Sequence, residues 1–129
     1  MKIDHVGIAV RSLESAIKAY EALGLNVSST DTVAGEAVRV AFLPVGDTRL
    51  ELLEPATPES SIAKSIEKRG EGVHHIALHV DDIEGSMKAA KEAGMQLVNE
   101  TPRVGAHGRK IAFIHPKSTS GVLIELVQG

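Results

Sequence analysis

Apolar and polar residues alternate in two stretches of the chain, residues 3–10 and residues 73–80. Successive side chains of a strand point to opposite faces, so this period of two predicts two β-strands. In the first strand the apolar face carries Val6, Ile8 and Val10. The second strand has the same pattern, and we expect both strands to bury one face under another element.

A helical period follows each of these strands. In the first half, apolar residues recur at i, i+3, i+4 and i+7, which marks one face of a helix. The four residues are Leu13, Ala16, Ile17 and Tyr20. Each predicted helix also has a polar residue suited to its N-cap and a glycine suited to the position after its end. These residues are Ser12 and Gly24 for the first helix and Asp82 and Gly94 for the second.

Three further short strands are predicted in each half. Their ranges are 25–30, 38–45 and 48–54 in the first half and 95–100, 109–114 and 121–127 in the second. Each half therefore has the order βαβββ. The segment between the halves predicts a connecting helix, with Pro58 in its first turn and Gly70 after its end. We interpret this helix as a linker.

The two halves are similar in sequence as well as in pattern. Residues 3–10 align with residues 73–80, and residues 50–53 align with residues 124–127. The offset between the halves grows from 70 to 74 residues, as expected when surface loops gain residues. We predict a single domain, 1–129, made of repeat 1 (1–56), a linker helix (57–70) and repeat 2 (71–129).

The composition is that of an ordinary globular domain, with 129 residues, 43% of them hydrophobic and 24% charged. The absence of cysteine excludes disulfides, thiolate zinc sites and a cysteine nucleophile. The net charge is −3 with both signs interspersed, so no basic stripe indicates nucleic acid as a partner. No apolar run approaches the ~20 residues that span a bilayer. We expect a cytoplasmic protein that binds neither nucleic acid nor membrane.

Two histidines and two glutamates occupy equivalent positions in the repeats, on the strand faces that point away from the predicted helices. They are His5, Glu51, His75 and Glu125. Two similar halves related by an approximate two-fold axis would bring these faces together. A single histidine or glutamate on a strand is usually a hydrogen-bonded structural residue, but two carboxylates buried together without a cation are costly. The four residues therefore predict a divalent-metal site of imidazole and carboxylate ligands, with room for two further oxygens.

The remaining histidines are weaker candidates. On this register we expect His74 to face the helix and to be structural, and His79 to form part of the wall beside His75. His115 stands at a strand end and suits a turn. His107 lies in a glycine-flanked loop, and the sequence leaves open whether its role is functional or structural.

Five segments resemble the vicinal oxygen chelate (glyoxalase/bleomycin-resistance/dioxygenase) superfamily and, within it, the methylmalonyl-CoA epimerases. They are residues 4–10, 50–55, 72–83, 105–108 and 115–128. The resemblance implies an α+β fold in which two βαβββ modules, related by a pseudo-two-fold, form one curved mixed sheet around a metal site with the helices outside. It also implies a homodimer that acts on a coenzyme A thioester. We expect cobalt as the metal, with manganese, nickel, zinc or magnesium as alternatives.

The resemblance implies interconversion of (R)- and (S)-methylmalonyl-CoA by removal of the α-proton through a chelated enolate. His5, Glu51, His75 and Glu125 match the family's ligand positions, and Glu125 matches a residue that is both ligand and base. The family often has glutamine where Glu51 stands, so this version is expected to be more anionic.

Epimerisation needs a second acid/base group, and here the sequence departs from its relatives. Some relatives place a glutamate on the third strand of the first half, near Arg39 or Val40, where this chain has no carboxylate. Glu36, Glu51 and His107 stay open as the second base, and Arg39 is an alternative contact for the substrate carboxylate.

Three other functions are compatible with parts of the pattern. A glyoxalase I-type lactoylglutathione lyase would use the same four ligands for similar enolate chemistry. A ring-cleaving dioxygenase would hold iron with two histidines and one carboxylate, and the fourth candidate ligand and the scarcity of aromatic residues count against it. A metal-free binding module of the same fold would not need four intact ligand positions.

Overall fold

The computed structural model describes residues 1–129, and its eight strands and three α-helices confirm the predicted α+β class. The chain divides into two compact units. The first unit is His5–His74, and the second unit is Met1–Asp4 together with His75–Gly129. The boundaries fall inside two strands, β1 (Lys2–Ala9) and β5 (Gly72–His79).

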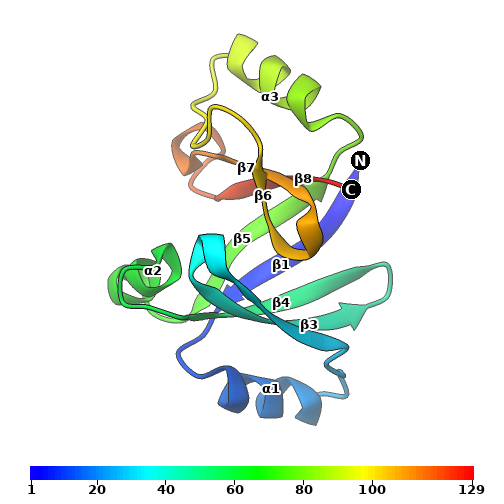
Figure 1. Ribbon diagram of the computed structural model, residues 1–129, viewed down its shortest axis with the longest axis vertical. Coiled ribbons are helices and arrows are strands. Elements are labelled where there is room, and N and C mark those ends of the chain that lie inside the picture. The colour runs from blue at the N-terminus through cyan, green and yellow to red at the C-terminus, as the bar shows by residue number, and fades with distance from the viewer. The chain divides into compact units, whose positions relative to one another are not determined.

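The first unit contains strands in the order β2-β3-β4-β1. β3 (Val38–Val45) pairs antiparallel with both β2 (Ser29–Val33) and β4 (Thr48–Pro55), and β4 pairs parallel with β1. Helix α1 (Leu13–Ala22) covers one face of β3 and β4 (Figure 1). A short 3-10 helix (Ala34–Glu36) links β2 to β3, and helix α2 (Ser61–Arg69) follows β4.

The core of the first unit confirms the predicted helical stripe. Leu13 is 1% exposed and packs with Val10, Ala41, Leu43 and Leu52. The other three stripe residues, Ala16, Ile17 and Tyr20, pack against the same cluster. Ser12 caps the helix by accepting a hydrogen bond from the Ser15 N–H, and Gly24 has the positive φ of 98° expected after a helix end. Because Leu50 and Leu52 belong to this core, Glu51 between them faces away from α1.

The second unit repeats this plan. Its strands run β5-β8-β7-β6, with β8 (Ile124–Gln128) parallel to β5 and antiparallel to β7 (Lys110–Ile114), which pairs with β6 (Arg103–Val104). Helix α3 (Ile83–Glu92), capped by Asp82, covers β7 and β8 (Figure 1). Two 3-10 helices, Ala106–Gly108 and Pro116–Ser118, flank β7. The core contains Val80, Ile83, Met87, Ala112, Ile114 and Leu126.

Two predicted strands are displaced. The strand expected at 25–30 lies at Ser29–Val33, and the strand expected at 95–100 is reduced to an isolated bridge between Leu97 and Ile114. Two backbone hydrogen bonds form this bridge, from the Val98 N–H to the Phe113 carbonyl and from the His115 N–H to the Gln96 carbonyl, both at 2.9 Å. Beside it, side chains accept from backbone N–H groups: Asn99 Oδ1 from Phe113 and Ser118 Oγ from Gln96, both at 2.8 Å. Local side-chain acceptors of this kind compete with sheet formation.

The linker helix begins later than predicted. Ser60 is its N-cap and accepts from the Ala63 N–H at 3.1 Å, so Pro58 lies before the helix and not in its first turn. A serine side chain satisfies the helix's unpaired N–H groups, which proline cannot do. Gly70 ends the helix as predicted, with φ of 79°. No helix has both the length and the apolar character needed to cross a membrane.

Candidate metal centre

The first unit holds one predicted pair of ligands. His5 on β1 and Glu51 on β4 are 3% and 5% exposed, and their Nδ1 and Oε2 atoms lie 3.2 Å apart. The parallel pairing of β1 with β4 sets the two strands side by side, and both residues occupy the face that α1 does not cover. The sequence prediction for this pair's orientation is therefore confirmed.

The second unit holds the equivalent pair. His75 on β5 and Glu125 on β8 are both 5% exposed, and Nε2 of His75 lies 2.9 Å from Oε1 of Glu125. Ile124 and Leu126, on either side of Glu125, pack on the α3 side, so Glu125 faces away from that helix. The repeat thus reproduces a buried histidine–carboxylate contact in both units.

Each pair has the donor chemistry and spacing of two neighbouring ligands of a divalent cation. Two ligand atoms bound at about 2.1 Å and at right angles lie about 3 Å apart, close to the separations of 3.2 Å and 2.9 Å found here. Imidazole nitrogen with carboxylate oxygen suits manganese, cobalt, nickel or zinc. Without a cation, the same spacing serves a hydrogen bond in which the imidazole N–H donates to the carboxylate. The residues present fit a metal.

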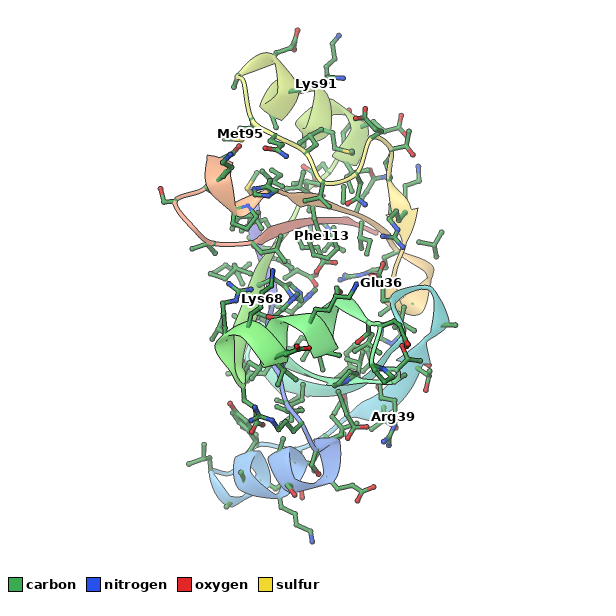
Figure 2. All side chains as sticks on the ribbon, turned by 90° about the vertical axis from the view of Figure 1, so that its left-hand side faces the viewer. Glu36, Arg39, Lys68, Lys91, Met95 and Phe113 are labelled. Atoms are coloured by element: carbon green, nitrogen blue, oxygen red, sulfur yellow. The ribbon has the colours of Figure 1, made fainter.

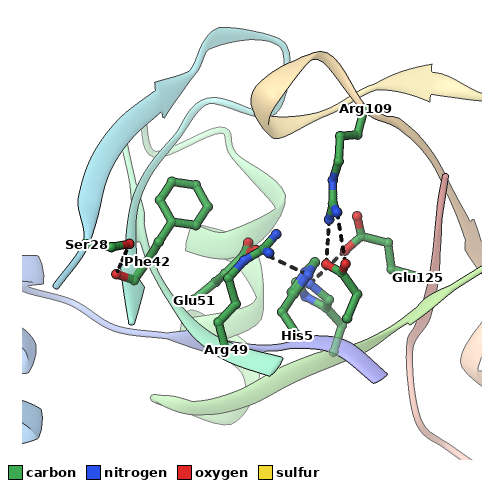
Figure 3. Close-up of polar contacts among 9 residues, drawn as sticks. His5, Ser28, Phe42, Arg49, Glu51, Arg109 and Glu125 are labelled. Carbon is green, nitrogen blue, oxygen red and sulfur yellow. Dashed lines mark hydrogen bonds and ion pairs between the residues drawn. The ribbon is translucent and has the colours of Figure 1, made fainter. Parts of the chain in front are cut away.

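The two pairs have different surroundings. In the first unit, Arg49 Nε donates to Glu51 Oε2 at 2.9 Å, and its guanidinium lies 5.6 Å from the centre of the Phe42 ring (Figure 3). In the second unit, the Phe113 ring meets the His75 ring edge to face, with centroids 5.8 Å apart. Arg49 was not predicted from the sequence. The available signal was its position two residues before Glu51, which places both on the same strand face.

A second missed contact joins Arg109 to Asp4 within the second unit. The guanidinium binds both carboxylate oxygens, with Nη1 of Arg109 2.9 Å from Oδ1 of Asp4, drawn as dashed lines at Arg109 in Figure 3. Asp4 is only 7% exposed. Its charge within an alternating apolar strand was the signal in the sequence. The contact anchors the chain directly after the predicted loop of His107, a residue that is exposed and has a positive φ of 60°.

His115 is the turn residue that the sequence predicts, since its Nδ1 accepts from the Lys117 N–H at 3.0 Å. Arg39, the alternative contact for the substrate carboxylate, lies on the face of β3 opposite to the one shared with Glu51. It pairs with Glu54 at 2.7 Å on the side of the strands that α1 covers (Figure 2). The opposite side of β3 carries only apolar residues, which are the buried Val38, Val40 and Phe42 and the exposed Pro44. As the sequence predicts, β3 therefore places no carboxylate on this face.

Comparison with known proteins gives relatives over nearly the whole chain. Residues 4–113 match the model of the Glyoxalase/Bleomycin resistance protein/Dioxygenase superfamily. The uncharacterized protein YqjC of Bacillus subtilis is 43% identical over 128 residues, which cover 98% of this chain and 91% of that protein. The ethylmalonyl-CoA/methylmalonyl-CoA epimerase of Cereibacter sphaeroides is 38% identical over 130 residues, covering 98% of this chain and 97% of that enzyme.

A solved structure is also similar. It is a methylmalonyl-CoA epimerase in complex with methylmalonyl-CoA and NH4+, with a TM-score of 0.93 and 37% sequence identity. The match covers 99% of this chain and 94% of that one. A likeness of this extent shows that the two chains share a fold, as the sequence resemblance implied.

Proposed function

The chain belongs to the Glyoxalase/Bleomycin resistance protein/Dioxygenase superfamily, and on this premise we propose that it interconverts (R)- and (S)-methylmalonyl-CoA. In this isomerisation a proton leaves the α-carbon of the acyl group and a proton is delivered to the opposite face. The observation that carries the proposal is the buried histidine–carboxylate contact that recurs in both units at equivalent positions.

We propose that the two pairs hold one divalent cation between them, so that residues 1–129 act as one domain. The ligands are His5, Glu51, His75 and Glu125. When bound, the cation supplies positive charge to the thioester and carboxylate oxygens of the substrate and so stabilises the enolate. Cobalt is the proposed ion, and manganese, nickel, zinc and magnesium share the same ligand chemistry.

Glu125 is the proposed base that removes the α-proton. Its carboxylate is held by the contact with His75 and lies beside Phe113, its cross-strand neighbour. Phe113 packs on an apolar cluster of Ala77, Ile111 and Val127 on β5, β7 and β8. Such a cluster keeps bulk water from this face, where a fixed charge acts more strongly on the substrate than it would in water.

The second proton carrier has three candidates in this chain: Glu36, Glu51 and His107. A carboxylate on β3 is not among them, because the corresponding face of that strand is apolar. Single replacements Glu36→Gln, Glu51→Gln and His107→Gln distinguish them. Loss of the second carrier blocks epimerisation but leaves proton exchange from one enantiomer intact, because Glu125 still removes and returns the proton on its own side.

The direct test is exchange of the substrate α-proton with deuterium oxide, followed by NMR, with metal-depleted and metal-restored protein. We expect exchange and epimerisation with (R)- and (S)-methylmalonyl-CoA, lost on metal removal and restored by cobalt. Turnover of methylglyoxal with glutathione, and none of methylmalonyl-CoA, would instead assign the lactoylglutathione lyase reaction. That reaction is the alternative because it uses the same ligand positions.

Two further parts of the proposal are expectations from the sequence: the homodimer from the resemblance, and the cytoplasmic location from the composition and the pattern of apolar residues. A homodimer is expected, and light scattering of the purified protein tests it. A cytoplasmic location is expected as well, and fractionation of source cells with an antibody to this chain tests it.

A further inference from the structure

Arg49 and Glu51 form an ion pair that is largely shielded from water. Nε of Arg49 lies 2.9 Å from Oε2 of Glu51, and the two side chains are 24% and 6% exposed. The guanidinium also lies over Phe42, the cross-strand neighbour of Glu51, at 5.6 Å from the ring centre. A cation held between a carboxylate and an aromatic face has a defined orientation, as expected of a built contact.

This cation is a point where the two repeats differ. The position equivalent to Arg49 in the second repeat is Leu123, which carries no charge and precedes Glu125 by the same two residues. The phenylalanines, by contrast, are retained in both repeats as cross-strand neighbours of the two glutamates. Along the chain, the residue two positions before the glutamate is therefore cationic in the first repeat and apolar in the second.

The contacts of Glu51 also distinguish its two oxygens. Both the His5 Nδ1 contact and the Arg49 Nε hydrogen bond involve Oε2. Oε1 takes part in neither of these contacts. Arg49 and Glu51 together carry no net charge. The sequence predicts that Glu51 makes the site more anionic than a glutamine would, but the positive charge of Arg49 cancels this difference.

We propose that Arg49 is a positioning residue that neutralises Glu51 and, by holding its Oε2, fixes the carboxylate in the orientation in which it serves as a ligand of a divalent cation beside His5. Arg49 and Glu51 then act as one unit that stands in for a neutral amide ligand. The proposal rests on the proposed metal-dependent function. It assigns the two carboxylates different roles: Glu125 is the base, and Glu51 is a fixed ligand, which leaves Glu36 and His107 as the candidates for the second proton carrier.

The physical consequence is a strong dependence of each residue on the other. Removing one member of a buried ion pair leaves an uncompensated charge, whereas removing both is often nearly neutral. Without Arg49, the Glu51 carboxylate lacks this compensation until a cation binds. Without the Glu51 charge, the guanidinium repels an incoming divalent cation.

A double-mutant cycle tests this coupling. The variants are Arg49→Leu, Glu51→Gln, the double variant and the conservative Arg49→Lys. Leucine is chosen because Leu123 stands at the equivalent position of the second repeat. Arg39→Leu is the matched control, because Arg39 pairs with a glutamate on the other face of the neighbouring strand. The two readouts are the melting temperature of the metal-free protein and the dissociation constant for Co2+ measured by calorimetry.

We expect Arg49→Leu to lower the melting temperature of the metal-free protein. We also expect Co2+ to raise the melting temperature of this variant by more than it raises that of the wild-type protein. Glu51→Gln should weaken Co2+ binding by about tenfold or more, within the range of losses when groups around a metal are altered. The double variant should bind Co2+ more tightly than Glu51→Gln alone and melt above Arg49→Leu. Arg49→Lys should restore the wild-type behaviour in part, and Arg39→Leu should leave Co2+ affinity unchanged.

The inference is overturned if Arg49→Leu has the same effect in the wild-type background as in the Glu51→Gln background. It is also overturned if Arg39→Leu changes Co2+ affinity as much as Arg49→Leu does. If the proposed function is wrong, the experiments give a different result. In that case the wild-type protein shows no exchange of the methylmalonyl-CoA α-proton, while the metal-free melting temperatures still report whether Arg49 and Glu51 are coupled.

Discussion

Glu54 and Gln128 occupy equivalent positions on the last strand of each repeat, and each accepts a hydrogen bond from the first N–H of its helix. Oε2 of Glu54 accepts from the Leu13 N–H, and Oε1 of Gln128 accepts from the Ile83 N–H, both at 2.8 Å. A helix begins with N–H groups that have no partner within the helix. The same position on the last strand therefore holds the start of each helix. The acceptor is a carboxylate oxygen in the first repeat and an amide oxygen in the second.

Replacing Glu54 by alanine should lower the free energy of unfolding by about 1 kcal/mol, the usual cost of losing a helix N-terminal acceptor. Glu54→Gln should lose less, because Gln128 shows that an amide oxygen accepts the same bond. Urea denaturation measures both, with the exposed Glu59→Ala as control. A loss from Glu54→Gln as large as that from Glu54→Ala would show that the charge pairing with Arg39 matters more than the helix contact.

The repeat made much of this fold predictable from the sequence. Glu51 and Glu125 could be assigned to the face away from the helices because the leucine and isoleucine residues beside them fix the register of each strand. The helix caps Ser12 and Asp82 follow from local chemistry and were placed correctly. These features depend on residues close together in sequence.

The features that were missed depend on contacts between distant residues. The expected strand near Leu97 is reduced to a short bridge, at whose ends the Asn99 and Ser118 side chains accept backbone hydrogen bonds from Phe113 and Gln96. Asp4 finds its partner Arg109 at a separation of 105 residues, which no local pattern reveals. The contact between Arg49 and Glu51 was within reach, because the two lie on one strand face, but only the structure shows which oxygen is bound.

The buried pair of Asp4 and Arg109 gives a prediction for stability. Arg109→Met keeps the length of the side chain but leaves the buried Asp4 carboxylate without the guanidinium, and we expect a loss of about 3 kcal/mol. Asp4→Asn combined with Arg109→Met should recover much of that loss. Arg11→Met is the matched control, because Arg11 pairs with Glu71 where both are exposed. Denaturant unfolding gives the free energies, and equal losses for Arg109→Met and Arg11→Met would contradict the prediction.

Removal of a proposed ligand gives a prediction for metal content. His75→Ala should lower the affinity for Co2+ by more than about tenfold, because removing a ligand costs at least as much as altering the groups that surround it. His79→Ala is the control on the same strand, since its side chain lies on the same face but is not in the ligand set. Elemental analysis after dialysis measures the outcome. Stoichiometric metal in His75→Ala would remove His75 from the ligand set.

Glu125 gives the most direct prediction for the reaction. Glu125→Gln keeps an oxygen that can bind a cation but cannot accept the α-proton, so we expect exchange of the methylmalonyl-CoA proton with deuterium oxide to fall by at least about 100-fold. The fold should be unchanged, because glutamine has nearly the same shape and Glu125 lies outside the α3 core. Circular dichroism and the melting temperature check this point. Glu84→Gln on the exposed face of α3 is the matched control and should exchange at the wild-type rate. Normal exchange in a folded Glu125→Gln protein would exclude Glu125 as the base and transfer that role to another of the candidate carboxylates or to His107.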